Sequence, residues 1–246
     1  LHVFPKVKLF LYKLAFKKAK KIIVINGKLK ELFIDFGLEP QKILVAHDSV
    51  DLKQFDVKKS KEECRQKLNL PLEKKLIIYT GHLLKLKGVY TLAKVSRFLD
   101  NDYQIVFVGG MKDDRIRLED FIKKNKLNKI MIVKHQPPYL IPLYLKSADV
   151  LALPNSFREK ISRFYTSPIK MFEYMASKRP IVASDLPSIR EVLNERNSFL
   201  FKSDNAQDLA LKIKLAVNDK ERAQQAFIDV QKYTWQKRAE NILGFI

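Results

Sequence analysis

The chain has 246 residues, 46% of them hydrophobic and 11% aromatic, which is enough apolar material for one large or two modest domains. Its single cysteine, Cys64, excludes an internal disulfide, and no apolar stretch approaches the ~20 residues of a membrane-spanning helix. The formal net charge of +20 predicts attraction to polyanions: nucleic acid, anionic membrane or phosphorylated substrates.

The excess charge comes mainly from lysines scattered through every part of the chain. That distribution suits a diffuse field better than a protein that reads a nucleic-acid groove. The sequence has no zinc-finger spacing, no RNP-type aromatic motif and no basic helix ahead of a heptad repeat. The composition therefore disfavours nucleic acid as a partner.

The first element in chain order is a helix predicted over residues 5–21, with lysines around a short apolar stripe. It is either a surface helix packed on a neighbouring domain or an interfacial helix in peripheral contact with anionic membrane. The stripe has no Trp at its edge, which favours the first interpretation. The chain begins with Leu1 and shows no signal peptide, so we expect a longer chain upstream and a cytoplasmic location.

Short apolar runs then alternate with helical stretches. Residues 22–46 predict a β-α-β fragment, and residues 51–71 are typical of a linker with a short charged helix. The strands expected after it are residues 76–81, 104–110, 129–134, 149–154, 180–184 and 198–201. The helices expected are residues 88–99, 114–125, 139–147, 167–177 and 187–194, with more from residue 206 onward. This pattern predicts an α/β fold, a doubly wound parallel sheet with helices on both faces.

Ligands of such a sheet bind at the carboxyl ends of its strands. After strand 76–81, Gly81 permits a sharp turn, Lys85 and Lys87 bring positive charge, and Gly88 opens a helix whose free amides favour an anion. The loop is neither a P-loop nor GxGxxG, so a lysine would have to meet any phosphate. A solvated lysine is the alternative.

Two more strand ends carry candidates. Gly109-Gly110 either allows close approach of a flat ligand or forms an ordinary tight turn. Ser167 and Pro168 are predicted as N-cap and first residue of a helix, which would point the amides of Ile169 and Lys170 towards a diphosphate. Glu173 could accept hydrogen bonds from a ribose diol. A Lys170–Glu173 surface pair is the alternative.

The stretch SPIKMFEYMASKRPIVASDLPSIREVL (167–193) resembles the carboxyl-terminal signature of family 4 glycosyltransferases, which have the GT-B fold. Other segments resemble that family in the same order along the chain. They are VAHDSVDLKQF (45–55), TGHLLKLKG (80–88), FVGG (107–110), ADVLALPNS (148–156) and YTWQKRAENIL (233–243). The resemblance covers the chain from about residue 20 to its end.

The resemblance implies retaining transfer of a sugar from a nucleoside-diphosphate-sugar to a glycan or lipid-linked acceptor, without cofactor or essential metal. Lys87 would neutralise the departing diphosphate, where electrostatic stabilisation matters most. Glu173 would hold the ribose, and the amides of residues 167–170 the phosphate.

The resemblance also divides the chain. Residues 51–232 would form the nucleotide-sugar-binding domain, residues 1–50 a remnant of the acceptor-side domain with the hinge, and residues 233–246 a helix packing back towards that remnant. We therefore expect the 246 residues alone to bind a nucleotide with little or no turnover.

Two positions depart from the family pattern. Tyr165 stands where the family has a glutamate that contacts the donor sugar, and His82 stands where an arginine follows the loop glycine. Neutral histidine offers neither a permanent charge nor a bidentate fork. Lys85 or Arg163 could replace the charge. These departures motivate the alternative of a non-catalytic basic module that binds RNA or anionic membrane.

The remaining candidates have structural interpretations. Trp235 is predicted to anchor the last helix in the core, and Asp51 to cap or brace the hinge. His135 could line a base pocket or lie in a plain loop. Cys64 has no histidine near it in sequence and is predicted to be inert.

Overall fold

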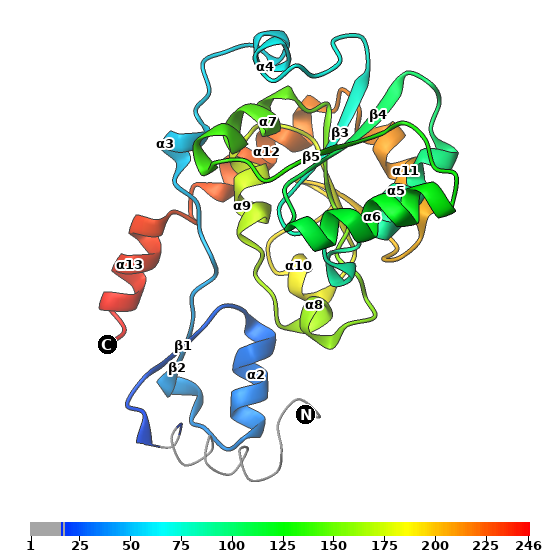
Figure 1. Ribbon diagram of the computed structural model, residues 1–246. Coiled ribbons are helices and arrows are strands. Elements are labelled where there is room, and N and C mark those ends of the chain that lie inside the picture. Colours follow the sequence, from blue (N-terminus) through cyan, green and yellow to red (C-terminus); the bar gives the residue numbers. More distant parts are fainter. Residues whose placement is uncertain (1–15, 17) are drawn as a thin grey trace.

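The computed structural model describes residue 16 and residues 18–246, so most of the helix expected over residues 5–21 falls outside the described part. A six-stranded sheet dominates this part (Figure 1), and every neighbouring pair in it is parallel. Its order is β5-β4-β3-β6-β7-β8. The strands are β3 (Lys75–Thr80), β4 (Tyr103–Val108), β5 (Ile130–Val133), β6 (Val150–Leu153), β7 (Ile181–Ser184) and β8 (Phe199–Phe201).

Alternate residues of the central strands enter two separate cores, since successive side chains of a strand point to opposite faces. In β3, Leu76 and Ile78 pack in one core, while Ile77 and Tyr79 pack in the other. Both faces are thus buried, which explains why the strands are apolar runs without polar alternation. The predicted α/β doubly wound class is confirmed.

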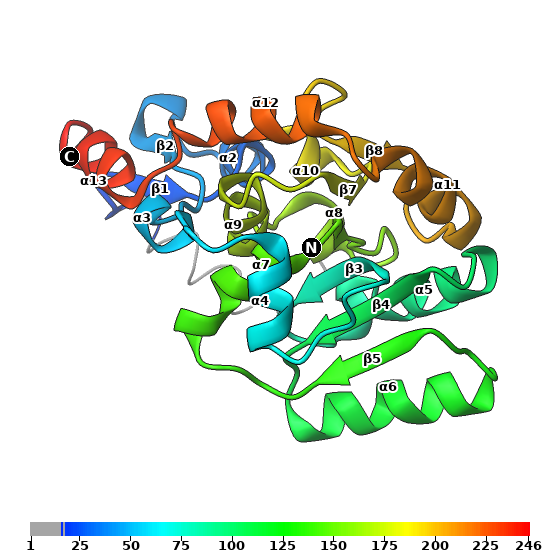
Figure 2. The ribbon, with the colours of Figure 1, turned by 90° about the horizontal axis from the view of Figure 1, so that it is seen from above.

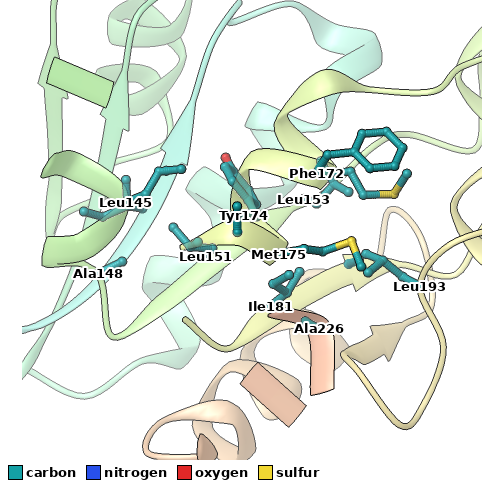
Figure 3. Packing of buried hydrophobic residues seen from close by; sticks show 14 of the residues in the cluster. Leu145, Ala148, Leu151, Leu153, Phe172, Tyr174, Met175, Ile181, Leu193 and Ala226 are labelled. Atoms are coloured by element: carbon teal, nitrogen blue, oxygen red, sulfur yellow. The ribbon is translucent and has the colours of Figure 1, made fainter. Parts of the chain in front are cut away.

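Helices cover both faces (Figure 1). One face carries α4 (Lys61–Lys67), α7 (Ile141–Ser147), α9 (Ile169–Ala176) and α12 (Lys220–Val230). The other carries α5 (Val89–Val95), α6 (Lys112–Lys124) and α11 (Ala206–Ala216). Figure 3 shows Phe172, Tyr174 and Met175 of α9 packed among the side chains of β6 and β7.

Three helical predictions differ from the structure. The expected helix 88–99 ends at Val95 and continues as a 3₁₀ turn over Ser96–Phe98, and the expected helix 187–194 is only α10 (Pro187–Arg190). The loop expected after β6 contains α8 (Lys160–Phe164). A single turn is too short to give a helical repeat of apolar residues, so the sequence pattern did not predict α8.

A small second sheet lies apart from the large one (Figure 1). It pairs β1 (Ile22–Val24) with β2 (Ile43–Val45), is covered by α2 (Gly27–Asp35), and confirms the β-α-β prediction. A 3₁₀ turn, Pro40–Lys42, precedes β2, and α3 (Leu52–Phe55) follows on the linker. Asp51 caps α3 by accepting from the amide of Lys53, as predicted.

The last helix, α13 (Trp235–Leu243), extends from the large domain beside β1 and β2 (Figure 2). Near it, the Lys21 ammonium lies 4.1 Å from the ring of Phe245. Trp235 is 44% exposed and no residue of α13 is buried, so the prediction of a core anchor was wrong. The physical reason is that α13 leaves the domain surface, so its residues have no core to enter.

An ion pair fixes α4 to the amino ends of the sheet. Arg65, only 3% exposed, donates to Asp149 across 2.6 Å and also to the carbonyls of Leu72, Lys74 and Ser147. Asp149 accepts in addition from Lys61 and from the amide of Leu76. Every charged partner in this cluster is satisfied, which is what makes a buried pair tolerable.

Within the described residues no helix is both long enough and apolar enough to span a bilayer. Cys64 is buried, and burial raises the pKa of its thiol, as expected for an inert cysteine.

Candidate donor-binding site

A pocket of about 600 Å³ opens where the loops after β3, β4, β5 and β6 meet. This is the edge at which a doubly wound sheet binds ligands. Most of the predicted site residues lie in it, together with Ile25 and Asp48 from the segments that lead to and from the small sheet. The predicted residues that line it are Gly81, His82, Lys87, Gly109, Gly110, Ser167, Pro168, Ile169, Lys170 and Glu173.

The loop after β3 brings Lys87 into this pocket. A 3₁₀ turn over Lys85–Lys87 precedes Gly88, which has a left-handed φ of 73° and is the N-cap residue of α5. The loop is held against the β6 side because the amide of Ser156 and the hydroxyl of Ser162 both donate to the carbonyl of Leu86. Burial lowers the pKa of Lys87. Lys87 is therefore a partly desolvated cation, a state in which an anion binds more strongly than it would in water.

Gly109 and Gly110 are needed for close packing inside the protein. Both have positive φ, and a Cβ on Gly109 would lie 2.6 Å from the carbonyl oxygen of Gly81. A Cβ on Gly110 would meet the side chain of Leu83 at 2.7 Å. The contact between the β3 and β4 loops thus accounts for both glycines, which favours the tight-turn interpretation over close approach of a ligand.

The start of α9 differs from the prediction. The helix begins at Ile169 with Pro168 at the N-cap, and no side chain caps it, so the assignment of Ser167 as N-cap was wrong. The hydroxyl of Ser167 instead accepts a hydrogen bond from the amide of Asp48, at 3.1 Å. Ser167 therefore does not compete with a ligand for the amides of Ile169 and Lys170.

The side chain of Lys170 points into the site rather than along the helix surface. Its ammonium donates to the Tyr79 hydroxyl at 2.7 Å and to the Thr80 carbonyl at 2.6 Å. The alternative of a Lys170–Glu173 surface pair is thus wrong. Burial, with the charge of Lys87, lowers the pKa of Lys170 to about 7, although Glu173 opposes the shift.

Glu173 lies one turn further along α9 and lines both this pocket and a smaller one of about 190 Å³ next to Trp235. Burial raises the pKa of its carboxyl, and the charge of Lys170 opposes that shift. Hydrogen bonds from the hydroxyl groups of a ligand would stabilise the Glu173 carboxylate, because they offset the cost of removing it from water.

His82 and His135 also line the pocket, and both are exposed. The backbone carbonyl of His82 accepts from the Tyr79 hydroxyl at 2.7 Å. The residues that the sequence did not predict are Tyr79 and Tyr174 beneath the pocket, where the Tyr174 hydroxyl accepts from the amide of Thr80. Both tyrosines belong to the hydrophobic core clusters, so nothing in the sequence distinguished them from other core residues.

Three predicted residues do not line this pocket. Tyr165 contacts Phe164 at 5.9 Å between ring centroids, and the Arg163 guanidinium stacks 3.8 Å from the ring centroid of Phe157. Lys85 lines a separate groove of about 750 Å³ between α5 and α6. That groove is the larger of the two, but it contains none of Lys87, Lys170 and Glu173, so the chemistry points to the smaller pocket.

In the described part of the chain, no three or more His, Cys, Asp and Glu side chains come together in a way that could hold a metal ion. That the reaction needs no metal stays a prediction.

Comparison with known proteins gives a consistent result. Residues 60–229 match the sequence profile of the family described as "Glycosyl transferases group 1". TuaC of Bacillus subtilis, a glycosyltransferase assigned to teichuronic acid biosynthesis, is 28% identical over 206 residues, which cover 81% of this chain and 47% of TuaC.

The N,N'-diacetylbacillosaminyl-diphospho-undecaprenol alpha-1,3-N-acetylgalactosaminyltransferase of Campylobacter jejuni is also 28% identical, over 85% of this chain and 54% of its own length. This chain thus spans about half the length of both relatives. Among solved structures, Anabaena Alr3699/HepE in complex with UDP superposes with a TM-score of 0.85 at 19% identity, over 99% of this chain and 68% of that one, which shows a shared fold.

Proposed function

Because the chain belongs to the glycosyl transferases group 1 family, we propose that its pocket binds the nucleoside-diphosphate part of a sugar donor. The observation that carries the proposal is the convergence of Lys87, the uncapped start of α9 and the half-buried Glu173 in one pocket at the carboxyl edge of the sheet. A cation and helix amides suit a diphosphate, and a carboxylate suits a ribose diol. The relative in the Anabaena structure holds UDP, which supports the same ligand class.

We propose that the whole protein transfers the sugar of this donor to a glycan or lipid-linked acceptor, with retention, without a metal, as a family 4 enzyme. Both relatives are named glycosyltransferases, and this does not support the alternative of a non-catalytic module. As the sugar departs, negative charge grows on the diphosphate, and Lys87 stabilises that charge more than it stabilises the bound donor. A peripheral place on the cytoplasmic face of an anionic membrane belongs to the same proposal and is supported by the net charge of +20.

Titration calorimetry with UDP, GDP and ADP tests the donor site. We expect at least one of the three to bind, and Lys87→Ala and Glu173→Gln each to weaken it by about 10- to 100-fold, because each variant loses a charge-assisted hydrogen bond. Lys85→Ala is the matched control, because Lys85 stands two residues away and outside the pocket, and its affinity should stay within about twofold. Failure of all three nucleotides to bind, or wild-type affinity in both site variants, would remove the basis of the proposal.

A further inference from the structure

The contacts of Lys170 give this residue a second role in the site. Its ammonium has three N–H donors, and the two protein acceptors within reach, the Tyr79 hydroxyl and the Thr80 carbonyl, are both neutral. A neutral amine keeps two N–H donors and so satisfies both of them. The third proton therefore has no acceptor among the described residues and is available to a ligand.

The side-chain nitrogen of Lys170 lies next to Gly81, where the loop between β3 and α5 begins. A Cβ on Gly81 would be 2.9 Å from it, so the absence of a side chain at Gly81 keeps the approach to this nitrogen open. Gly81, Lys87 and Lys170 line the same pocket, where the ammonium adjoins the uncapped start of its own helix.

Burial, together with the positive charge of Lys87, favours loss of that third proton while no nucleotide is bound. Lys87 from the loop repels it, and Glu173 on the same helix attracts it without forming an ion pair. Of the other titratable groups, Tyr79 from β3 accepts from Lys170, Tyr174 from α9 binds the amide of Thr80, and His82, His135 and Asp48 line the same pocket. Burial is the largest effect, and its pKa of about 7 means that the two forms are nearly balanced at neutral pH.

We propose that the side-chain amine of Lys170 is a proton-switched ligand of the donor diphosphate, which takes up one proton from solvent when the nucleotide binds and donates the new N–H to a phosphate oxygen. The inference rests on the proposed donor site. It makes nucleotide affinity depend on pH: affinity is full while free Lys170 is charged, and falls by up to tenfold per pH unit above the pKa of the free protein.

The test is calorimetry of UDP, GDP and ADP between pH 7.5 and 9.5, where the terminal phosphate, with a pKa of about 6, is already ionised. Each titration is run in two buffers of different ionisation enthalpy, so that proton uptake is counted. For wild type we expect net proton uptake at pH 7.5 and a dissociation constant that rises at least tenfold across the range. Lys170→Met should bind about tenfold more weakly than wild type at pH 7.5 and approach wild type at pH 9.5.

Lys170→Arg keeps a permanent charge and should lose the pH dependence that belongs to this residue. Titration of Lys87 is common to wild type and Lys170→Met, so the difference between their curves isolates Lys170. A constant ratio of affinities at every pH would mean that Lys170 only positions the loop, and equal affinities would mean that it has no role; either result overturns the inference. If Lys87→Ala and Glu173→Gln weaken binding while Lys170→Met does not, the donor site stands and this inference alone fails; if wild type binds none of the three nucleotides, both fail.

Discussion

Replacing Gly88 by alanine is expected to lower the free energy of unfolding by about 2–5 kcal/mol and to remove most of the nucleotide affinity. A Cβ at this position would lie 1.7 Å from the carbonyl oxygen of Pro154, which is backbone and cannot rotate away. The left-handed φ of 73° adds about 1–2 kcal/mol for any residue with a Cβ, and forced overpacking adds about 1–3 kcal/mol. Relief of the clash must move the loop, and Lys87 moves with it.

The measurement is urea denaturation, followed by nucleotide calorimetry on the folded fraction. Gly37→Ala is the matched control, because Gly37 also has a positive φ, of 86°, but no atom lies within 4 Å of the added Cβ. Gly37→Ala should lower the free energy of unfolding by only about 1–2 kcal/mol, the cost of the left-handed backbone, and leave nucleotide binding intact. Equal losses of stability in the two variants would show that the approach of Gly88 to Pro154 is not as close as described.

Arg65→Met is expected to lower the free energy of unfolding by about 3–5 kcal/mol at pH 7, because it removes one of the two cations that pair with the mostly buried Asp149 and frees three backbone carbonyls. Burial raises the pKa of Asp149, but hydrogen bonds from Lys61 and the Leu76 amide, with the charge of Arg65, lower it further, so the net pKa is below the ordinary carboxyl value. The contribution of this carboxylate is therefore complete above the unfolded pKa of about 3.9 and is lost as pH falls through the lower folded value.

Urea denaturation at pH 7 measures the effect. The matched control is Lys75→Met, which breaks a pair of similar length, 2.8 Å to Asp102, whose side chains are 43% and 47% exposed. Solvent screens this pair, so its loss should cost no more than about 1 kcal/mol. A small loss in Arg65→Met would contradict the view that the cluster anchors α4 to the sheet.

The large sheet could be predicted because its strands carry their own signal. A run such as Leu76–Tyr79 is uniformly apolar, flanked by charged or turn-forming residues, and this combination occurs when both faces of a strand are covered. The single turn α8 and the exposure of Trp235 in α13 were harder to predict. α8 is a single turn, and Trp235 is a large apolar residue whose exposure depends on where the chain goes after Tyr233, which local pattern does not determine.

In the candidate site, too, some residues could be placed from the sequence and others could not. The positions of Lys87 and Glu173 at strand ends and on a helix face follow from periodicity, and the family resemblance gave them roles. The ammonium of Lys170 could not be placed, because its partners Thr80 and Tyr79 are 90 and 91 residues away in sequence. The hydroxyl of Ser167 was predicted to accept from the amides of its own helix, whereas in the structure it accepts from the distant amide of Asp48. Local rules fail where tertiary contacts compete for the same group.

The order of strands in the large sheet also bears on how the protein assembles. β3, β4 and β5 are joined by one crossover each, but β3 must also pair with β6, which begins 70 residues after β3 ends. Non-local parallel pairing of this kind is slow, because the entropy of closing the loop is lost before the contacts form. Loops from the β3–β5 half form one wall of the pocket and residues 166–170 form the other. The nucleotide pocket is therefore complete only after β3 has paired with β6. A nucleotide binds only chains that have passed this step. Bound nucleotide is thus expected to slow unfolding without changing the rate of folding.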